Sequence, residues 1–423
     1  MIGRLFLLTA SECETTPDRL FIIMMSSLGY FHFSTLFGAG VTSLFTVLTV
    51  ALAIYILTAV SVPRVHWRSL PLAIRMGIVL FIWLTTSIAW SEAPLEVSLK
   101  YLMEYRIYWI APLLFLVLRR YTYAPLLILA FCILGMFSAL ISSYMLYLNM
   151  IHVDGLHFSF ANRIFHAFVL NLQIVLTVSI FVACFRKNLI FTALLGIVLL
   201  LTIYNLLNVE TGRTGYVTFF ALLFLPLLYF SSNFSRCILS VLGFILLFIF
   251  AYSFLEKFSI GVDQLARNVA LFDLGSSPTN SVSKRMTFYF SGFLIFKEHP
   301  ILGVGVGDVD NALAGLYHDG SVALQTDNVH SEFLNMLVSG GVIAGLLYLS
   351  IPLALALEGL KLKSAPMVIC FVGLGTVMFV SGLFTSIIKD FGEKPALMVL
   401  IPVFYRLAES GVMNLFHRDD QFT

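Results

Sequence analysis

Residues 326–345 read TDNVHSEFLNMLVSGGVIAG and join a polar segment to an apolar one. The polar segment contains Asp327, Asn328, His330, Ser331 and Glu332. The apolar run that follows continues to Leu357 and is long enough to cross the roughly 30 Å hydrocarbon core of a membrane as a helix. Ionisable residues at such a boundary are costly and often functional. His330 is therefore the first candidate for proton chemistry, because imidazole titrates near neutral pH.

The composition predicts an integral membrane protein. Of 423 residues, 59% are hydrophobic and 11% are charged, whereas a typical soluble domain has roughly 25% charged residues. The apolar runs are about 20 residues long and lack the alternation of barrel strands. We therefore expect an all-α fold, a polytopic helical bundle in the membrane. The net charge of +2 is small, so membrane lipids, and no nucleic acid, are the expected partners.

Apolar runs bounded by charge, proline or glycine predict about twelve transmembrane helices. They lie near residues 20–37, 41–62, 71–90, 107–118, 124–150, 164–185, 189–207, 215–230, 237–255, 333–357, 366–388 and 396–413. The fourth run is short, and we expect it to extend back toward Tyr105. No separate soluble domain is evident, so residues 1–423 are expected to form a single membrane domain.

Basic residues predict the orientation, because cytoplasmic loops are rich in Lys and Arg. With the N-terminus inside, every second loop is basic, whereas the outer loops carry mixed charge. The inner loops contain Arg64, Arg68, Arg119, Arg120, Arg186, Lys187, Arg236, Lys361 and Lys363. Both termini are then expected in the cytoplasm, as an even number of spans requires.

One connection, residues 256–329, is much longer than the others and is expected on the outer face before the tenth span. Within it, an apolar and aromatic stretch from Met286 to Phe296 is flanked by charged residues. This stretch is too short to span the membrane. It predicts an interfacial helix along the outer surface, ended by Pro300 and the glycines that follow. A loop of this length is usually functional unless it is disordered, and this one is too apolar for disorder.

The predicted topology brings three distant groups to the outer side: Arg213, Arg285 and His330. Two guanidinium groups and an imidazole at one surface indicate capture of an anion, with phosphate or diphosphate the natural match. The alternative for a single arginine is that it only reaches lipid head groups. For His330, the helix N-terminus favours a neutral ring and the nearby carboxylates favour a charged one, so the sign of its pKa shift stays open.

Four further residues are weaker candidates for substrate binding: Arg163, Lys100, His299 and Asp327. Each also has a structural alternative, such as interfacial anchoring or helix termination. His330 has no second histidine at helical spacing, so we expect no metal site. Gly340 and Gly341, with Ala344 and Gly345, are expected to form a small-residue face for close helix packing.

His330 and Ser331, followed after nine residues by Gly341 on a late span, resemble a motif of the O-antigen ligase family. The wider group includes O-antigen polymerases and protein O-oligosaccharyltransferases. The segment HPILGVGVGD, preceded by Arg285, is similar to part of that group's large periplasmic loop, and Arg213 in TGRTG resembles its other functional arginine. One departure is Ala344, where the family's pattern prefers Gly, Thr or Tyr.

The resemblance implies an O-antigen ligase, a glycosyltransferase of lipopolysaccharide biosynthesis in the bacterial inner membrane with a periplasmic active site. The donor would be O-antigen linked to undecaprenyl diphosphate, and the acceptor a sugar hydroxyl of lipid A-core. His330 would act as general base, and Arg213 with Arg285 would bind the diphosphate. Diphosphate is a good leaving group, so we expect no cofactor, neither ATP nor metal, and inversion by a single displacement.

Two kinds of alternative remain. An O-antigen polymerase or a protein O-oligosaccharyltransferase would use similar residues with another acceptor. The lack of an extra soluble domain favours the ligase. A transporter or flippase of lipid-linked glycan would also need outer arginines, but it predicts polar residues near the bilayer midplane and often internal repeats.

Overall fold

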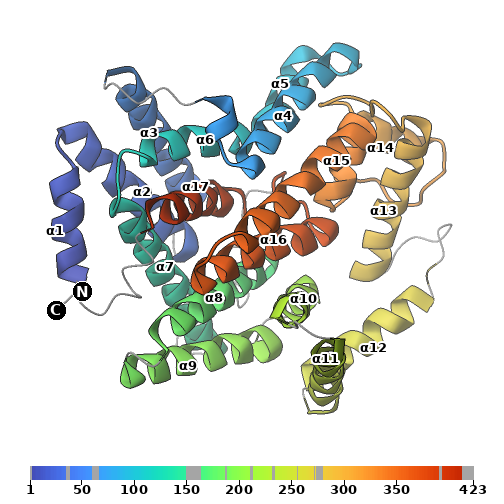
Figure 1. The fold of residues 1–423 in the computed structure, drawn as a ribbon. Coiled ribbons are helices and arrows are strands. Elements are labelled where there is room, and N and C mark those ends of the chain that lie inside the picture. The colour runs from blue at the N-terminus through green and yellow to red at the C-terminus, as the bar shows by residue number, and fades with distance from the viewer. Residues whose placement is uncertain are drawn as a thin grey trace.

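The computed structural model describes residues 2–34, 39–59, 66–148, 163–185, 188–209, 213–230, 234–254, 256–270, 272, 280–389 and 393–411. Within these ranges the chain is helical and contains no strand. The expected all-α class is thereby confirmed (Figure 1).

Every expected span corresponds to a helix. These helices are α2 (Thr16–Ser34), α3 (Ala39–Ala59), α4 (Leu72–Thr86), α6 (Ile107–Leu118), α7 (Ala124–Tyr147), α8 (Arg163–Cys184), α9 (Leu189–Tyr204), α10 (Arg213–Phe230), α11 (Phe234–Phe254), α15 (Glu332–Leu360), α16 (Ala365–Phe384) and α17 (Lys394–Ser410). The remaining α-helices are α1 (Ile2–Glu12), α5 (Leu95–Glu104), α12 (Glu256–Ala270), α13 (Ser281–Glu298) and α14 (Val309–His318).

The number of helices able to cross a membrane is lower than we expected. Seven helices in the described ranges are long and apolar enough, or nine if two bent pairs, α5 with α6 and α11 with α12, each count as one span. The expected spans at α2, α10 and α17 do not qualify. Of α10, Arg213–Phe224 counts as a shorter apolar helix, α17 has only 17 residues, and α2 carries Asp18 and Arg19 near its start. The chain is a multi-pass membrane protein.

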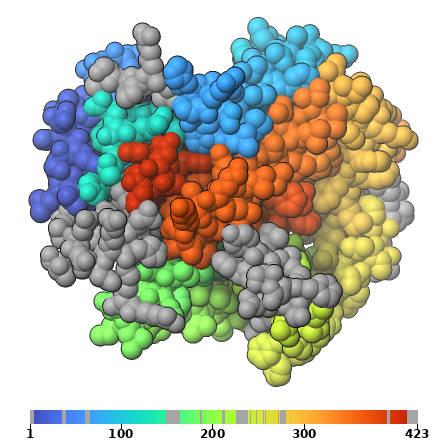
Figure 2. All heavy atoms as spheres, in the orientation of Figure 1, coloured from blue at the N-terminus to red at the C-terminus, as the bar shows by residue number. Residues whose placement is uncertain are grey.

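Helices α15 and α16 run side by side through the centre of the bundle (Figure 1). Helix α4 packs against α15, while α8 and α10 pack against α16. On the face shown in Figure 2, α15, α16 and α17 reach the surface. A second, smaller apolar cluster joins α10, α11 and α12 to α7 and α8, and includes Leu170, Phe220 and Phe258. These contacts bring the start of α10 and the end of α16 to the same place.

The long connection contains three helices, α12, α13 and α14. The helix expected around residues 286–296 is present as α13, which begins earlier because the Asn280 side chain accepts the backbone N–H groups of Val282 and Ser283. It ends at Glu298, directly before His299 and Pro300, as the sequence predicts. Its position at the membrane surface stays a prediction.

Helix α15 is broken at Gly340 and Gly341, where the backbone leaves helical geometry. Gly341 has φ +67°, and a Cβ there would lie 1.9 Å from the Ile301 carbonyl oxygen. The loop after α13 fills the break, since Val342 N donates to Pro300 O at 2.9 Å. The expected helix-packing face was therefore wrong for Gly341, which instead admits the backbone of a loop.

Candidate active site

His330 lies in a turn directly before Ser331, the N-cap residue of α15. Its φ of 50° makes it the only non-glycine residue with a positive φ in the described ranges. Its backbone N–H donates to Asn328 Oδ1 at 2.9 Å. The imidazole lies against Phe288 of α13, with ring centroids 4.9 Å apart and an interplanar angle of 38°. The side chain is therefore held between the turn and α13.

Arg285 lies one turn before Phe288 on α13 and faces the end of α16. Its Nη1 donates to Thr214 Oγ1 at 3.3 Å and to the Phe384 carbonyl at 3.2 Å. The Tyr289 hydroxyl donates to the same carbonyl at 3.3 Å. No carboxylate of the described residues forms an ion pair with Arg285. Its positive charge is thus met by neutral oxygens, an arrangement that suits an anionic ligand.

Arg213 is the first residue of α10, directly before the threonine that accepts from Arg285. Its Nη2 donates to Gln264 Oε1 of α12 at 2.8 Å. Arg213 also lies in the wall of a cavity of about 450 Å³ between α10, α11 and α12. The rest of that wall is mainly aromatic and aliphatic, and includes Phe220, Phe244 and Phe258. Arg213 thus lies at a large apolar surface.

Lys389, in the turn after α16, adds a further cation beside His330. Its Nζ donates to the Asp327 carbonyl at 2.9 Å and lies 3.7 Å from an Asp310 carboxylate oxygen of α14. The same Nζ lies 4.8 Å from the centre of the Tyr101 ring of α5. The Tyr101 hydroxyl donates to Asp310. Helices α5 and α14 are thereby joined to the His330 turn.

The surroundings of His330 lower its pKa from the ordinary value of 6.5. Burial is the largest cause, because it disfavours the charged ring, and the positive charge of Arg285 acts in the same direction. Asp327 raises the pKa, and Lys389 lowers it again. Neutral imidazole therefore predominates at pH 7. The direction of the pKa shift, which the sequence left open, is downward.

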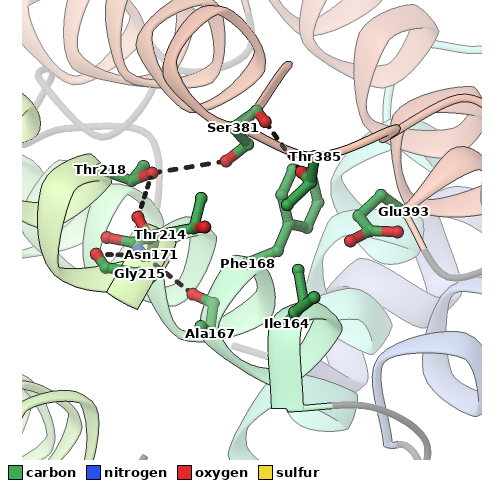
Figure 3. A pocket seen from close by; sticks show the side chains of 10 residues that line it. All are labelled: Ile164, Ala167, Phe168, Asn171, Thr214, Gly215, Thr218, Ser381, Thr385 and Glu393. Carbon is green, nitrogen blue, oxygen red and sulfur yellow. Dashed lines mark hydrogen bonds between the residues drawn. The ribbon is translucent and has the colours of Figure 1, made fainter. Parts of the chain in front are cut away.

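A small cavity of about 10 Å³ lies beside Thr214, enough for about one water molecule (Figure 3). The side chain of Asn171 of α8 donates to Gly215 O of α10 at 3.2 Å, and Thr218 Oγ1 lies 3.4 Å from Ser381 Oγ of α16. These hydrogen bonds hold α8, α10 and α16 together beside Thr214, the residue that accepts from Arg285.

The structure brings together some of the expected residues and separates others. Arg285, His330 and Asp327 meet, and α10 brings Arg213 to the same end of the bundle. His299 is exposed at the opposite end of α13, about 20 Å along the helix from Arg285. Lys100 is exposed on α5, one residue before Tyr101. The backbone of Arg163 begins α8, but its side chain lies outside the described part of the chain.

Sequence reasoning gave no site role to Lys389, Tyr289 or Asn328. In the sequence, Lys389 is only one of several charged residues in an outer loop that carries both positive and negative charge. The signal available was the polar start of TSIIKD, residues 385–390, directly after an apolar span. For Tyr289, the signal was its place one turn after Arg285 on the same predicted helix.

Comparison with known proteins gives a likeness at the level of a family. A search of curated proteins finds no match. The sequence model of the O-antigen ligase family matches residues 195–349, a range that contains Arg213, Arg285 and His330. This match supports placing the chain in the O-antigen ligase and polymerase group, and supports glycosyltransferase activity of that type.

Proposed function

We propose that the protein is an O-antigen ligase that transfers glycan from undecaprenyl diphosphate to a sugar hydroxyl of lipid A-core. What carries this proposal is the placing of His330, whose pKa is lowered by burial and by Arg285, beside an arginine whose hydrogen-bond partners are neutral oxygens. A base without a nearby cation would not favour the binding of a diphosphate. A cation without a base would bind the diphosphate but would not take the proton from the acceptor hydroxyl. Together they suit displacement of a diphosphate by a hydroxyl group.

In the proposed reaction, the acceptor hydroxyl transfers its proton to His330 as its oxygen attacks the anomeric carbon. The bond between that carbon and the diphosphate oxygen breaks, and its electron pair leaves with the diphosphate. Arg213 and Arg285 stabilise the charge that develops on the leaving group. A single displacement inverts the anomeric configuration. Because diphosphate is already a good leaving group, the step needs neither ATP nor a metal ion.

The cavity beside Arg213 supports a lipid-linked donor. Its volume is about 450 Å³, its wall is almost entirely apolar, and Arg213 is among the residues that line it. A polyprenyl diphosphate has the same division, with an apolar chain joined to a charged head. Burial of apolar chain contributes about 0.8 kcal/mol for each CH₂ group. We assign the cavity to the part of the polyprenyl chain that lies nearest the diphosphate.

The site is proposed to face the periplasm from the inner membrane, with both termini cytoplasmic if α2, α10 and α17 also cross the membrane. This assignment follows from the sequence, in which every second loop is basic and the long connection before His330 falls on the other side. Residues 256–329 would then form the periplasmic part of a single membrane domain, with α13 along the membrane surface.

Reconstitution tests the proposal. Purified protein in liposomes receives undecaprenyl-diphosphate-linked glycan and lipid A-core, with chelator and without ATP, and lipopolysaccharide ladders are followed on a gel. Transfer to lipid A-core supports the ligase. Elongation of the lipid-linked glycan instead identifies a polymerase, and transfer to protein an O-oligosaccharyltransferase. Movement of donor across the bilayer without any transfer supports a flippase and rejects the enzyme.

A further inference from the structure

We propose that Asn328 is a positioning residue that fixes His330 relative to Arg285. This inference rests on the proposed function, because it assigns the histidine a catalytic task. Asn328 itself is buried and is not assigned to substrate. It acts through a hydrogen-bond network that connects the His330 turn to residues 384–389, the segment at the end of α16.

The Asn328 side-chain oxygen is the centre of this network. Its Oδ1 accepts the His330 backbone N–H at 2.9 Å, the Ser386 hydroxyl at 2.9 Å and the Asn335 amide at 3.2 Å. The Asn335 amide also donates to Ser386 Oγ at 3.0 Å. Asn328, Asn335 and Ser386 are 7%, 1% and 0% exposed, so water does not compete well for these bonds.

The backbone of His330 requires this support. A φ of 50° is uncommon for a residue with a side chain and persists only where its surroundings enforce it. Asn328 is itself fixed by Thr326, whose hydroxyl donates to Asn328 O at 2.8 Å and accepts Asn328 N–H at 3.2 Å. Losing the Asn328 oxygen therefore frees the His330 amide and lets the turn relax.

Residues 384–389 also hold the anion-binding side of the site. The Phe384 carbonyl accepts Arg285 Nη1 and the Tyr289 hydroxyl. Two residues later, Ser386 donates to Asn328. One short segment therefore contacts both the residue that binds diphosphate and the network that holds the base.

The buried side chain of Glu332 completes this connection. Its carboxylate accepts the backbone N–H groups of Ile388 at 2.8 Å and Lys389 at 3.2 Å. Its own N–H donates to Thr385 O at 3.0 Å. A shift of residues 384–389 therefore also moves the start of α15. This one segment sets the distance between His330, the base, and Arg285, the anion-binding residue. Small displacements of reacting groups cost large factors in rate.

Asn328→Ala is expected to lower kcat for glycan transfer by about 10- to 100-fold while the KM for the donor stays within about two-fold. Hydrogen exchange of the peptide covering residues 328–333 should become faster, because the His330 amide loses its acceptor. This second measurement does not depend on transfer, so it decides the positioning role even if wild-type protein transfers nothing and the proposed function fails.

Asn328→Asp retains the oxygen and is expected to restore the slow exchange. Its carboxylate favours the charged imidazolium and so raises the pKa of His330. In a plot of kcat against pH, the fall of kcat on the acidic side (the acidic limb) should therefore occur at higher pH than in wild type. A variant that had simply lost its fold would show neither slow exchange nor transfer with a shifted limb. The pair of variants therefore separates positioning from general loss of structure.

Asn188→Ala is the matched control. Asn188 Oδ1 also accepts a backbone N–H, that of Phe191 at 3.0 Å, but it caps α9 and is not part of the network. It should change exchange near residue 191 and leave kcat unchanged. Unchanged exchange at residues 328–333 in Asn328→Ala, or an acidic limb that stays in place in Asn328→Asp, would overturn the proposal.

Discussion

The two ends of the bundle treat charged groups differently. At the end that contains Glu12, Glu358 and Arg119, carboxylates receive donors from helix starts. Glu358 accepts the N–H of Leu72 at 2.8 Å and the Tyr405 hydroxyl, while Glu12 accepts three N–H groups at the start of α7. Arg119 is paired with Glu409 at 3.3 Å. We call this the Glu358 end.

Glu358 lies near one end of α15, whereas the His330 end, which contains Arg213, Arg285, His330 and Lys389, lies at the start of that helix. There Arg285 donates to a hydroxyl and a carbonyl oxygen, and His330 is held neutral. The comparison teaches that pairing, and not the number of charges, distinguishes structure from function. Charges that cap helices or pair with each other stabilise the Glu358 end. At the His330 end, Glu332 and the Lys389–Asp310 pair do the same, whereas Arg285 meets neutral oxygens and so suits an anionic ligand.

The largest expected effect that tests this contrast comes from His330→Ala. Removing the general base should lower transfer by at least 100-fold, while donor binding is largely retained. The measurement is ladder formation together with equilibrium binding of labelled donor. His318→Ala, at the exposed C-terminal turn of α14, serves as the control and should leave transfer and donor binding unchanged. Wild-type turnover in His330→Ala would remove the histidine from the mechanism.

The next effect compares one arginine from each end. Arg285→Ala should weaken donor binding by about 10- to 100-fold, since hydrogen bonds to charged groups contribute about 1.5–3 kcal/mol. Arg119→Ala should leave donor binding unchanged and lower stability by less than about 1 kcal/mol, because it loses a partly exposed ion pair. Equal losses of binding in both variants would show that the two ends do not differ as described.

The broken helix behind His330 provides a test of stability. Gly341→Ala should destabilise the protein by about 1–3 kcal/mol, because alanine disfavours φ +67° and its Cβ would meet the Ile301 carbonyl. Thermal unfolding in detergent measures the change. Gly315→Ala is the matched control, since a Cβ at that helical position meets nothing within 4 Å. If both variants melt at the wild-type temperature, the break does not support the site.

The smallest effect is a shift of the pH profile. His330 must be neutral to act as base, and its pKa lies below 6.5, so the acidic limb of kcat/KM should also lie below pH 6.5. Lys389→Met removes a cation and should raise the limb, whereas Asp327→Asn removes an anion and should lower it. Each shift is expected to be under about one pH unit. Limbs that move in the same direction in both variants would contradict this electrostatic account.

The sequence predicts the helices well because their cause is local. Long apolar runs with charged or proline boundaries form helices whether or not their neighbours are known. The expected extension toward Tyr105 is present as α5, which meets α6 at a bend of 48°. Length and composition say less about which helices cross the membrane, as α2 and α17 illustrate.

The sequence predicts less of the site, because its contacts join distant residues. Asp310 and Tyr101 are separated by 209 residues, and nothing local in either segment indicates that pairing. The glycines at 340 and 341 look the same whether they face a helix or admit a loop. Only the backbone of Pro300 and Ile301 beside them decides which occurs.

The network around Asn328 also determines when the site can form during synthesis. Ser386 follows Asn328 by 58 residues, and α15 and α16 lie between them. A ribosome must therefore complete both helices before the His330 turn acquires its partners. A nascent chain halted within α16 would already contain His330, Arg285 and Arg213 and still lack the arrangement proposed for transfer. On the proposed function, transfer would therefore begin only after nearly the whole chain has been synthesised.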